Sequence, residues 1–191
     1  MPHENTAMVA LGGNMPFAGQ SPEQTLRRAI TAVQTPQITV TQKSALFKTP
    51  CFPKGAGPDY VNAAVLLSLA PGLAATDLLT HLHAIETTFG RQRESRWGMR
   101  TLDLDLLAFG DLVLPDLATH ARWRGLAPDD QARLSPPELI LPHPRIQDRA
   151  FVLVPLADIA PDWVHPVLRR SVAQMLADLP AQDRADVQRL P

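Results

Sequence analysis

The chain has 191 residues, of which 45% are hydrophobic and 19% are charged, and its formal net charge is -1. This length and hydrophobic content are enough to bury one sizeable core, so we expect a single domain over residues 1–191. The balanced charge excludes a strong overall attraction to nucleic acid or to an anionic membrane surface, so any anion site must be local.

Simple features of the chain also argue against a membrane-spanning protein, a secreted protein and a site built from cysteines. No run approaches the roughly 18 apolar residues of a membrane span, and the first residues lack the basic and apolar regions of a secretory signal. Cys51 is the only cysteine, which rules out an internal disulfide and a zinc site built from cysteines. We therefore expect a cytoplasmic protein with no membrane partner.

The first elements in chain order are a strand and a helix. Met8–Leu11 is a short apolar run that ends at two glycines, which is typical of a buried strand followed by a tight turn. Ser21, Pro22 and Gln24 then provide a helix start with a capping box. We expect this helix to end near Pro36.

Three strands and a second helix are predicted in the region that follows. Residues 38–47 have the composition of a strand exposed on one face, and the Pro- and Gly-rich range 49–59 must be a loop. Residues 60–69 and 101–109 alternate like strands, and a helical stripe between them ends at Gly90. The order β-α-β-β-α-β predicts an α+β protein with a ferredoxin-like core, in which helices pack on an antiparallel sheet.

The rest of the chain is expected to form a C-terminal extension of this core. The polar, proline-containing range 111–140 is interpreted as an insertion loop. Residues 151–156 form a packed apolar segment, and Ser171 with Gln174 predicts the start of a last helix. We expect the tail after residue 180 to be frayed.

The stretch from Gly90 to Phe109, GRQRESRWGMRTLDLDLLAF, carries most of the chemical information. Because side chains alternate along a strand, Asp103 and Asp105 point to one side and the leucines between them point to the core. Two carboxylates at this spacing, about 7 Å by the strand rise, repel unless cations lie between them. Mg²⁺ prefers oxygen ligands, so the pair predicts a metal–nucleotide site.

Positive charge converges on the same segment. The arginines that precede the two aspartates are Arg91, Arg93, Arg96 and Arg100. Arginine forks and divalent ions together neutralise the charge that develops in phosphoryl-type transfer. A solvated network of surface ion pairs is the alternative interpretation, but the concentration of charges around one tryptophan favours a functional site.

Tyr60 and Asn62 provide a second polar feature. They share the strand face opposite the hydrophobic alternation, so on an inner strand they need partners or a cleft. A flat aromatic ligand with polar edges would satisfy both residues. The pattern alone fits a structural interpretation about as well as a ligand site. In that interpretation Asn62 bonds a neighbouring loop and Tyr60 covers the sheet edge.

The run RWGMRTLDLDLLAFG resembles the signature of the 6-hydroxymethyl-7,8-dihydropterin pyrophosphokinase family. The resemblance extends to GGN at 12–14, FKTPCF at 47–52, DYVNAAV at 59–65 and LPHPRIQDRAFVLVPLADIAP at 141–161. It implies an ATP-dependent pyrophosphokinase of folate biosynthesis, a diphosphotransferase that moves pyrophosphate from ATP to the hydroxymethyl group of the pterin and releases AMP. It also implies two Mg²⁺ ions at Asp103 and Asp105, and we expect a monomer.

The resemblance implies roles for individual residues. The catalytic residues would be Arg91, Arg100, Asp103 and Asp105. The residues that bind ATP would be Arg91, Arg93, Arg96, Trp97, Arg100 and His143. The residues that bind the pterin would be Thr49, Pro50, Phe52, Tyr60, Asn62, Trp97 and Phe151.

The chain departs from compact members of that family in three respects. Cys51 stands where many members have proline, and we interpret it as a small packed thiol. Glu138 stands five residues before His143, where compact members have an arginine that contacts ATP; Arg133 or Arg145 could replace it. The 111–140 range is also longer than in compact members. It could have a role at the nucleotide, or it could be a solvated flap or a subunit contact.

Two rival functions belong to other classes. A ferredoxin-like sheet can bind RNA, but such modules display stacking aromatic residues, and only 5% of this chain is aromatic. We therefore expect no nucleic-acid partner. The second rival is a catalytically inactive domain that senses a nucleotide or a pterin, because a fold does not fix its function. The presence of both aspartates and the arginines argues against it.

Overall fold

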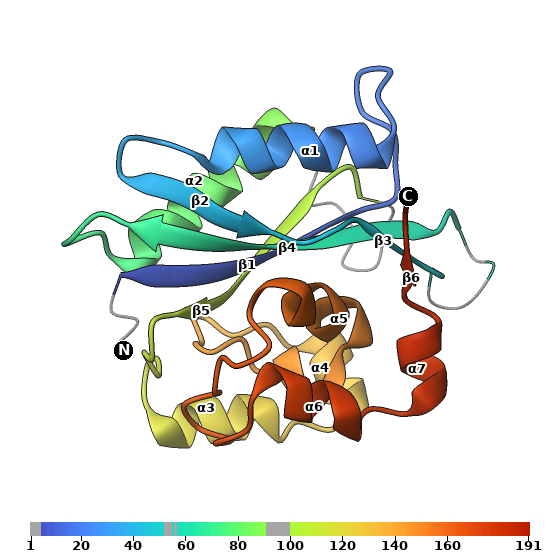
Figure 1. The fold of residues 1–191 in the computed structure, drawn as a ribbon. Helices are drawn as coiled ribbons and strands as arrows, with labels where there is room; N and C mark the ends of the chain where they lie inside the picture. The colour runs from blue at the N-terminus through green and yellow to red at the C-terminus, as the bar shows by residue number, and fades with distance from the viewer. Residues whose placement is uncertain (1–4, 52–54, 56, 91–99) are drawn as a thin grey trace.

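The computed structural model of the chain describes residues 5–51, 55, 57–90 and 100–191 (Figure 1). The described residues form a six-stranded sheet in the order β5-β1-β4-β3-β6, and β2 also pairs with β4. All of these pairings are antiparallel. The strands are β1 (Thr6–Gly13), β2 (Ile38–Lys43), β3 (Phe47–Thr49), β4 (Tyr60–Leu69), β5 (Asp103–Phe109) and β6 (Gln188–Arg189).

The predicted α+β class and ferredoxin-like core are confirmed, with one strand divided in two. Residues 38–43 form β2, the chain leaves the sheet after Ser44, and β3 begins at Phe47. Ser44 bonds Ala64 of β4 twice: its N–H donates to the Ala64 carbonyl at 2.9 Å, and its Oγ accepts the Ala64 N–H at 2.9 Å. The Ala45 N–H instead donates to the Asp158 carboxylate at 3.1 Å.

Two helices, α1 (Pro22–Val33) and α2 (Ala75–Thr88), cover one face of the sheet (Figure 1). The capping box that predicted α1 is present, since the Ser21 side chain accepts the Gln24 N–H and the Gln24 side chain accepts the Ser21 N–H. Their apolar residues, including Leu26, Leu78 and Leu82, are fully buried against the odd-numbered side chains of β4. This is the larger of the two cores that the structure describes.

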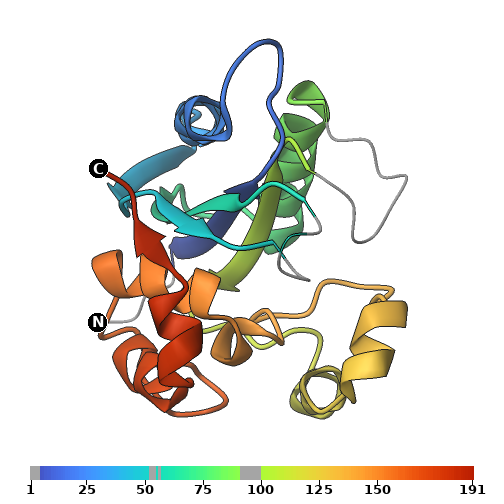
Figure 2. The ribbon, with the colours of Figure 1, turned by 90° about the vertical axis from the view of Figure 1, so that its right-hand side faces the viewer.

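The opposite face carries a smaller core and a second set of helices (Figures 1 and 2). The helix α5 (Ala150–Ile159) packs Leu153 and Leu156 against Met8 and Ala64 of the sheet. The other elements of this layer are η1 (Ile146–Asp148), α6 (Val172–Asp178) and α7 (Ala181–Ala185). The Ser171–Gln174 capping box predicted for α6 is present.

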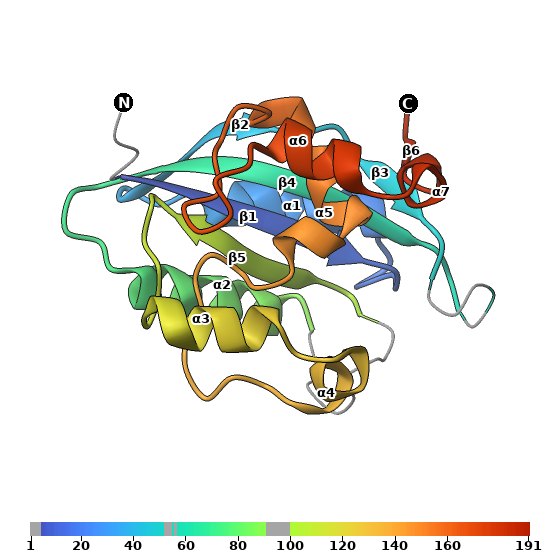
Figure 3. The ribbon, with the colours of Figure 1, turned by 90° about the horizontal axis from the view of Figure 1, so that it is seen from below.

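The range 111–140 is not the irregular loop that we predicted. It contains α3 (Leu117–Arg124) and α4 (Pro128–Arg133), which lie on the β5 side of the lower layer, away from α6 and α7 (Figures 2 and 3). The Asp116 carboxylate caps α3 by accepting the Thr119 N–H at 2.8 Å. Both helices are short and lack a continuous apolar stripe, so hydrophobic periodicity could not reveal them.

The tail after residue 180 forms ordered elements where we expected fraying. It consists of α7 and β6, and β6 pairs with the edge strand β3. The Leu190 N–H donates to the Leu46 carbonyl at 2.8 Å, and the Arg189 guanidinium lies over the Phe47 ring at 5.9 Å. The tail therefore covers the edge of the sheet, a position that otherwise exposes unpaired backbone groups.

Within the parts of the chain that the structure describes, no helix combines the length and the apolar composition that crossing a bilayer demands.

Two buried histidines connect α3 to the segment before α6. His120 and His165 are both 0% exposed, and their ring centroids lie 5.9 Å apart. His165 Nδ1 accepts the N–H groups of Val167 and Leu168 at 3.1 and 3.2 Å. Burial, followed by the neighbouring His120, lowers the pKa of His165 to about 4.

The lowered pKa of His165 predicts a loss of stability in acid. The unfolded residue has a pKa near 6.5, so its contribution is complete above that pH and is lost as the pH falls toward the folded pKa of about 4. We expect the free energy of unfolding to fall by about 2 kcal/mol from this residue between pH 7.5 and pH 5. His165→Asn keeps an acceptor near Nδ1 but cannot titrate, so urea unfolding of this variant should show a weaker pH dependence. An identical pH dependence in both proteins would contradict this account.

Candidate functional site

The candidate site lies at the end of the sheet where β1 finishes and β4 and β5 begin. The antiparallel register places Gly12 opposite Asn62 on one side and opposite Asp103 on the other. Directly opposed residues in antiparallel strands point to the same face, so Asn62 and Asp103 face the same space across Gly12. A Cβ at Gly12 would lie 3.1 Å from Asn62 Oδ1, so glycine keeps this space open.

The two aspartates lie as the strand alternation predicted. Asp103 and Asp105 have side chains 21% and 38% exposed, whereas Leu104 between them is 2% exposed and belongs to the core. The Arg100 guanidinium donates to the Asp103 carboxylate, and Arg149 Nη1 lies 3.8 Å from Asp105 Oδ2. Each carboxylate therefore faces a guanidinium, which offsets the repulsion between the two negative charges.

The electrostatic field of this corner extends to Tyr60. Burial opposes the charge of Arg100, but the negative charges of Asp103 and Asp105 outweigh it and raise the pKa of the guanidinium. Burial also raises the pKa of the Tyr60 phenol; the Arg100 charge acts against this shift and the Asp103 charge adds to it. Tyr60 is therefore a neutral hydroxyl at neutral pH, able to donate and accept hydrogen bonds.

The aspartate pair has the donor chemistry of a magnesium site but is not a complete cage. Within residues 5–51, 55, 57–90 and 100–191, no three His, Cys, Asp or Glu side chains are grouped as metal ligands. Asp103 and Asp105 could supply carboxylate oxygens, and the other ligands would come from water or phosphate. Mg²⁺ is usually held in this way at nucleotide sites, by one or two carboxylates and substrate phosphates.

Asn14 connects three parts of the site, although sequence reasoning assigned it no role beyond the GGN resemblance. Its side-chain Oδ1 accepts the Arg100 N–H at 2.9 Å, and its Nδ2 donates to the Pro58 carbonyl at 3.1 Å. Its own backbone N–H donates to the Arg100 carbonyl at 2.9 Å. A Cβ at Gly13 would lie 2.6 Å from the Thr101 carbonyl oxygen, so this close approach of β1 to the start of β5 requires glycine.

Glu86 of α2 fixes the position of the aspartate strand. Its side chain is 1% exposed, and Oε1 accepts the Leu104 N–H at 2.7 Å. Among the strands that the structure describes, β5 lies at the edge of the sheet, so this N–H faces no partner strand on its outer side. The buried Glu86 carboxylate accepts this N–H in place of a strand, and so fixes the backbone of Leu104 between the two aspartates.

The second wall of the site comes from β3 and β4. Asn62 Nδ2 donates to Thr49 Oγ1 at 2.8 Å, and both residues are buried. Pro50 and Tyr60 are half-buried beside them. Cys51 Sγ donates to the Gly57 carbonyl and accepts its N–H, at 3.0 and 3.1 Å, and the residue is 6% exposed. These contacts and this burial agree with the interpretation of Cys51 as a small packed thiol.

The third wall comes from the segment between Leu141 and α5. His143 is half-buried; its backbone N–H donates to the Leu107 carbonyl at 2.7 Å, and its Nδ1 accepts the Arg145 N–H at 3.1 Å. Burial, followed by the charges of Arg149 and Arg145, lowers the pKa of His143 to about 3. The ring is therefore neutral at pH 7 and carries its proton on Nε2.

Phe151 and Arg149 complete this wall. Phe151 is 41% exposed at the first turn of α5, so it is not part of the core. The Arg149 guanidinium lies 5.6 Å from the centre of its ring while also facing Asp105. Sequence reasoning assigned no role to Arg149, and its only signal was its position two residues before Phe151.

The described site residues that we predicted therefore lie around one corner of the sheet, on three walls. They are Thr49, Pro50, Tyr60, Asn62, Arg100, Asp103, Asp105, His143 and Phe151. The other predicted residues, Phe52, Arg91, Arg93, Arg96 and Trp97, lie outside the described residues. Their roles stay predictions.

Comparison with protein families gives one match that covers most of the chain. Residues 8–161 match the family described as 7,8-dihydro-6-hydroxymethylpterin-pyrophosphokinase (HPPK). The chain is 38% identical over 172 residues to the 2-amino-4-hydroxy-6-hydroxymethyldihydropteridine pyrophosphokinase of Synechocystis, across 89% of this chain and 74% of that protein. It is 36% identical to the protein of the same name from Pseudomonas aeruginosa, across 96% of this chain and 95% of that protein.

Solved structures with a similar fold include the HPPK-DHPS protein of Plasmodium falciparum. A structure of it with pterin and p-hydroxybenzoate has a TM-score of 0.69 and 14% sequence identity, and the match covers 97% of this chain and 46% of that chain. A second structure of the same protein has a TM-score of 0.65 and 15% identity. The present chain spans about half the length of these proteins, and at this identity the likeness shows the fold alone.

Proposed function

The chain belongs to the 7,8-dihydro-6-hydroxymethylpterin-pyrophosphokinase family, and from that premise we propose how its residues perform the reaction. The enzyme is an ATP-dependent pyrophosphokinase of folate biosynthesis. It transfers pyrophosphate from ATP to the hydroxymethyl group of 6-hydroxymethyl-7,8-dihydropterin and forms AMP and the pterin diphosphate. The observation that supports the assignment of residues is the pair Asp103 and Asp105 on one face of β5, opposite Asn62 across Gly12.

The nucleotide half of the site is proposed to lie between β5 and the His143 segment. Asp103 and Asp105 would hold Mg²⁺, which neutralises phosphate charge when it is bound. Arg100 and Arg149 pair with these carboxylates in the structure, and both guanidinium groups have the geometry to bind phosphate oxygens when a nucleotide arrives. His143 would donate a hydrogen bond from Nε2–H to the nucleotide.

The pterin half is proposed to lie between β3, β4 and the start of α5. Thr49 Oγ1 accepts one Asn62 amide hydrogen, which orients the other end of the amide, Oδ1, toward Gly12. Asn62 Oδ1 would accept an N–H group from the edge of the pterin, while Tyr60 and Pro50 border the ring. Phe151 is exposed and would stack on the face of the pterin.

The chemical step needs no nucleophile from the protein. The pterin hydroxyl oxygen attacks the β-phosphorus of ATP, the bond from that phosphorus to the α,β-bridging oxygen breaks, and AMP leaves with the electron pair. The hydroxyl proton is released. Arg100 would stabilise the negative charge of the transferred group, together with Arg91 of the predicted set. Two Mg²⁺ ions, a monomeric state and a cytoplasmic location are the finer parts of this proposal.

The proposal predicts a specific product. With Mg²⁺ and ATP, AMP should form only when 6-hydroxymethyl-7,8-dihydropterin is present, as measured by chromatography of the nucleotides. Asp103→Asn and Asp105→Asn should each lower the turnover number by about a hundredfold or more, because each removes a negative charge from the proposed metal site. Asp111→Asn changes an exposed aspartate just beyond β5 and serves as the control, with activity near that of the wild type.

Two outcomes would contradict the assignment. Formation of ADP instead of AMP would show transfer of a single phosphoryl group. Full activity in both aspartate variants would remove these residues from the mechanism. An inactive domain that only binds its ligands would form no AMP under any of these conditions.

Asn62→Ala tests the pterin half separately. This change removes the amide whose oxygen lies beside Gly12, so we expect the dissociation constant of the pterin to rise about tenfold. The affinity for a non-hydrolysable ATP analogue should stay within about twofold. Thr49→Val removes the oxygen that orients the amide and should weaken pterin binding in the same direction but less. Calorimetry with each ligand makes the comparison, and equal losses for both ligands would contradict the role of Asn62.

A further inference from the structure

The range 111–140 is fastened to the segment that carries His143. Leu114 and Leu141 bond each other through their backbones, at 2.9 Å in one direction and 3.2 Å in the other. On α3, His120 Nε2 lies 3.0 Å from the Pro142 carbonyl oxygen. Both contacts hold the residues immediately before His143, so the insertion is neither detached from the body of the protein nor a solvated flap.

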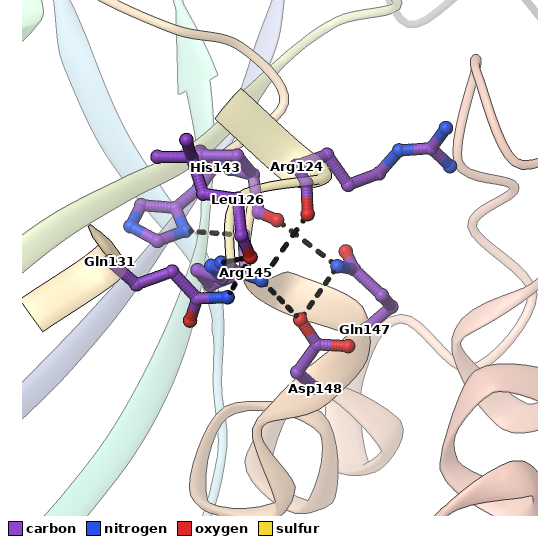
Figure 4. Close-up of polar contacts among 8 residues, drawn as sticks. Arg124, Leu126, Gln131, His143, Arg145, Gln147 and Asp148 are labelled. Carbon is purple, nitrogen blue, oxygen red and sulfur yellow. Dashed lines mark hydrogen bonds and ion pairs between the residues drawn. The ribbon is translucent and has the colours of Figure 1, made fainter. Parts of the chain in front are cut away.

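Arg145 makes a third attachment, on the other side of His143 (Figure 4). Its Nη1 donates to the Arg124 carbonyl and its Nη2 donates to the Leu126 carbonyl, both at 3.3 Å. Nη1 also bonds the Asp148 carboxylate at 3.0 Å, and the side chain is only 12% exposed. A cation suits this place because the last carbonyls of a helix lack intrahelical partners and carry the negative end of its dipole.

The backbone of the same residue fixes the ring of His143. The Arg145 N–H donates to His143 Nδ1 (Figure 4). The His143 N–H donates to the Leu107 carbonyl of β5. Nδ1 is therefore an acceptor, which leaves Nε2 as the N–H donor of the neutral ring. Arg145 thus bonds the insertion with its side chain and His143 with its backbone.

The bonds of Arg145 argue against direct contact between its guanidinium and ATP. Arg145 and Arg133 are the two arginines considered as replacements for the one absent at Glu138. The Arg145 guanidinium already bonds three protein oxygens. Arg133 bonds Asp130 of the same short helix, and its side chain is 75% exposed.

We propose that Arg145 is a positioning residue for nucleotide binding. It holds His143 between the insertion and β5 and fixes the tautomer of the His143 ring. The insertion then contributes to the nucleotide site through His143, without touching ATP. Ordering of the ring before binding lowers the entropy that must be lost when the nucleotide binds. The inference rests on the proposed role of His143 in nucleotide binding.

A double-mutant cycle between Arg145 and His143 tests this directly. Arg145→Ala should raise both the KM for ATP and the dissociation constant of a Mg²⁺-bound, non-hydrolysable ATP analogue by about five- to tenfold. The turnover number should change by less than about twofold. In the His143→Ala background, the same change should have almost no further effect. Arg133→Ala is the matched control and should bind the analogue like the wild type.

The other outcomes overturn the proposal. Additive losses in the double variant would indicate that Arg145 acts independently of His143, for example by touching the phosphates. Unchanged affinity in the Arg145 variants would show that the attachment has no role in nucleotide binding. If Arg145→Ala does not fold, Arg145→Lys can replace it, because lysine keeps the charge but cannot bond both carbonyls. Arg145→Lys should bind the analogue with an affinity between those of the wild type and Arg145→Ala. In the His143→Ala background it should again have almost no further effect.

A second measurement does not depend on turnover. Nitrogen-15 NMR of the histidine side chains should show the His143 ring of the wild type with an unprotonated Nδ1, and a mixture of tautomers in the Arg145 variant. The same tautomer ratio in both proteins would overturn the positioning role. Absence of AMP from the wild-type enzyme would defeat the proposed function, whereas analogue binding and NMR would still decide the role of Arg145.

Discussion

Two carboxylates held on the same face of one β-strand are the constraint on which the rest of the site depends. Asp103 and Asp105 repel each other, and a sheet gives no backbone means of separating them. The structure offsets the repulsion with a guanidinium at each one, Arg100 and Arg149. It also fixes the strand itself, because the buried Glu86 carboxylate accepts the outward N–H of Leu104.

The polar corner exists because the two cores do not cover the whole sheet. On the face of the aspartates, α5 and α6 bury Met8, Ala64 and Ala108, which lie farther along the strands than Gly12 and Asp103. The remaining end of that face is bordered by the start of α5 and by the segment of His143. A rigid sheet therefore supplies the floor, and segments from the second half of the chain supply one wall.

Much of this arrangement could be predicted from the sequence, because its signals are local. Strand alternation placed Asp103 and Leu104 on opposite faces, and capping boxes gave the starts of α1 and α6. The features that escaped prediction depend on tertiary contacts. No period or motif in the sequence reveals three of these features. They are the short helices without an apolar stripe, the tail that pairs with the edge strand β3, and the double contact of Arg149.

The most direct test of the central claim is a crystal structure with Mn²⁺ in place of Mg²⁺ and a non-hydrolysable ATP analogue, because Mn²⁺ is located by its anomalous scattering. We expect metal peaks bound by the carboxylate oxygens of Asp103 and Asp105 at about 2.1 Å, a typical distance for a small octahedral cation. Metal bound to the nucleotide but remote from both aspartates would contradict this expectation.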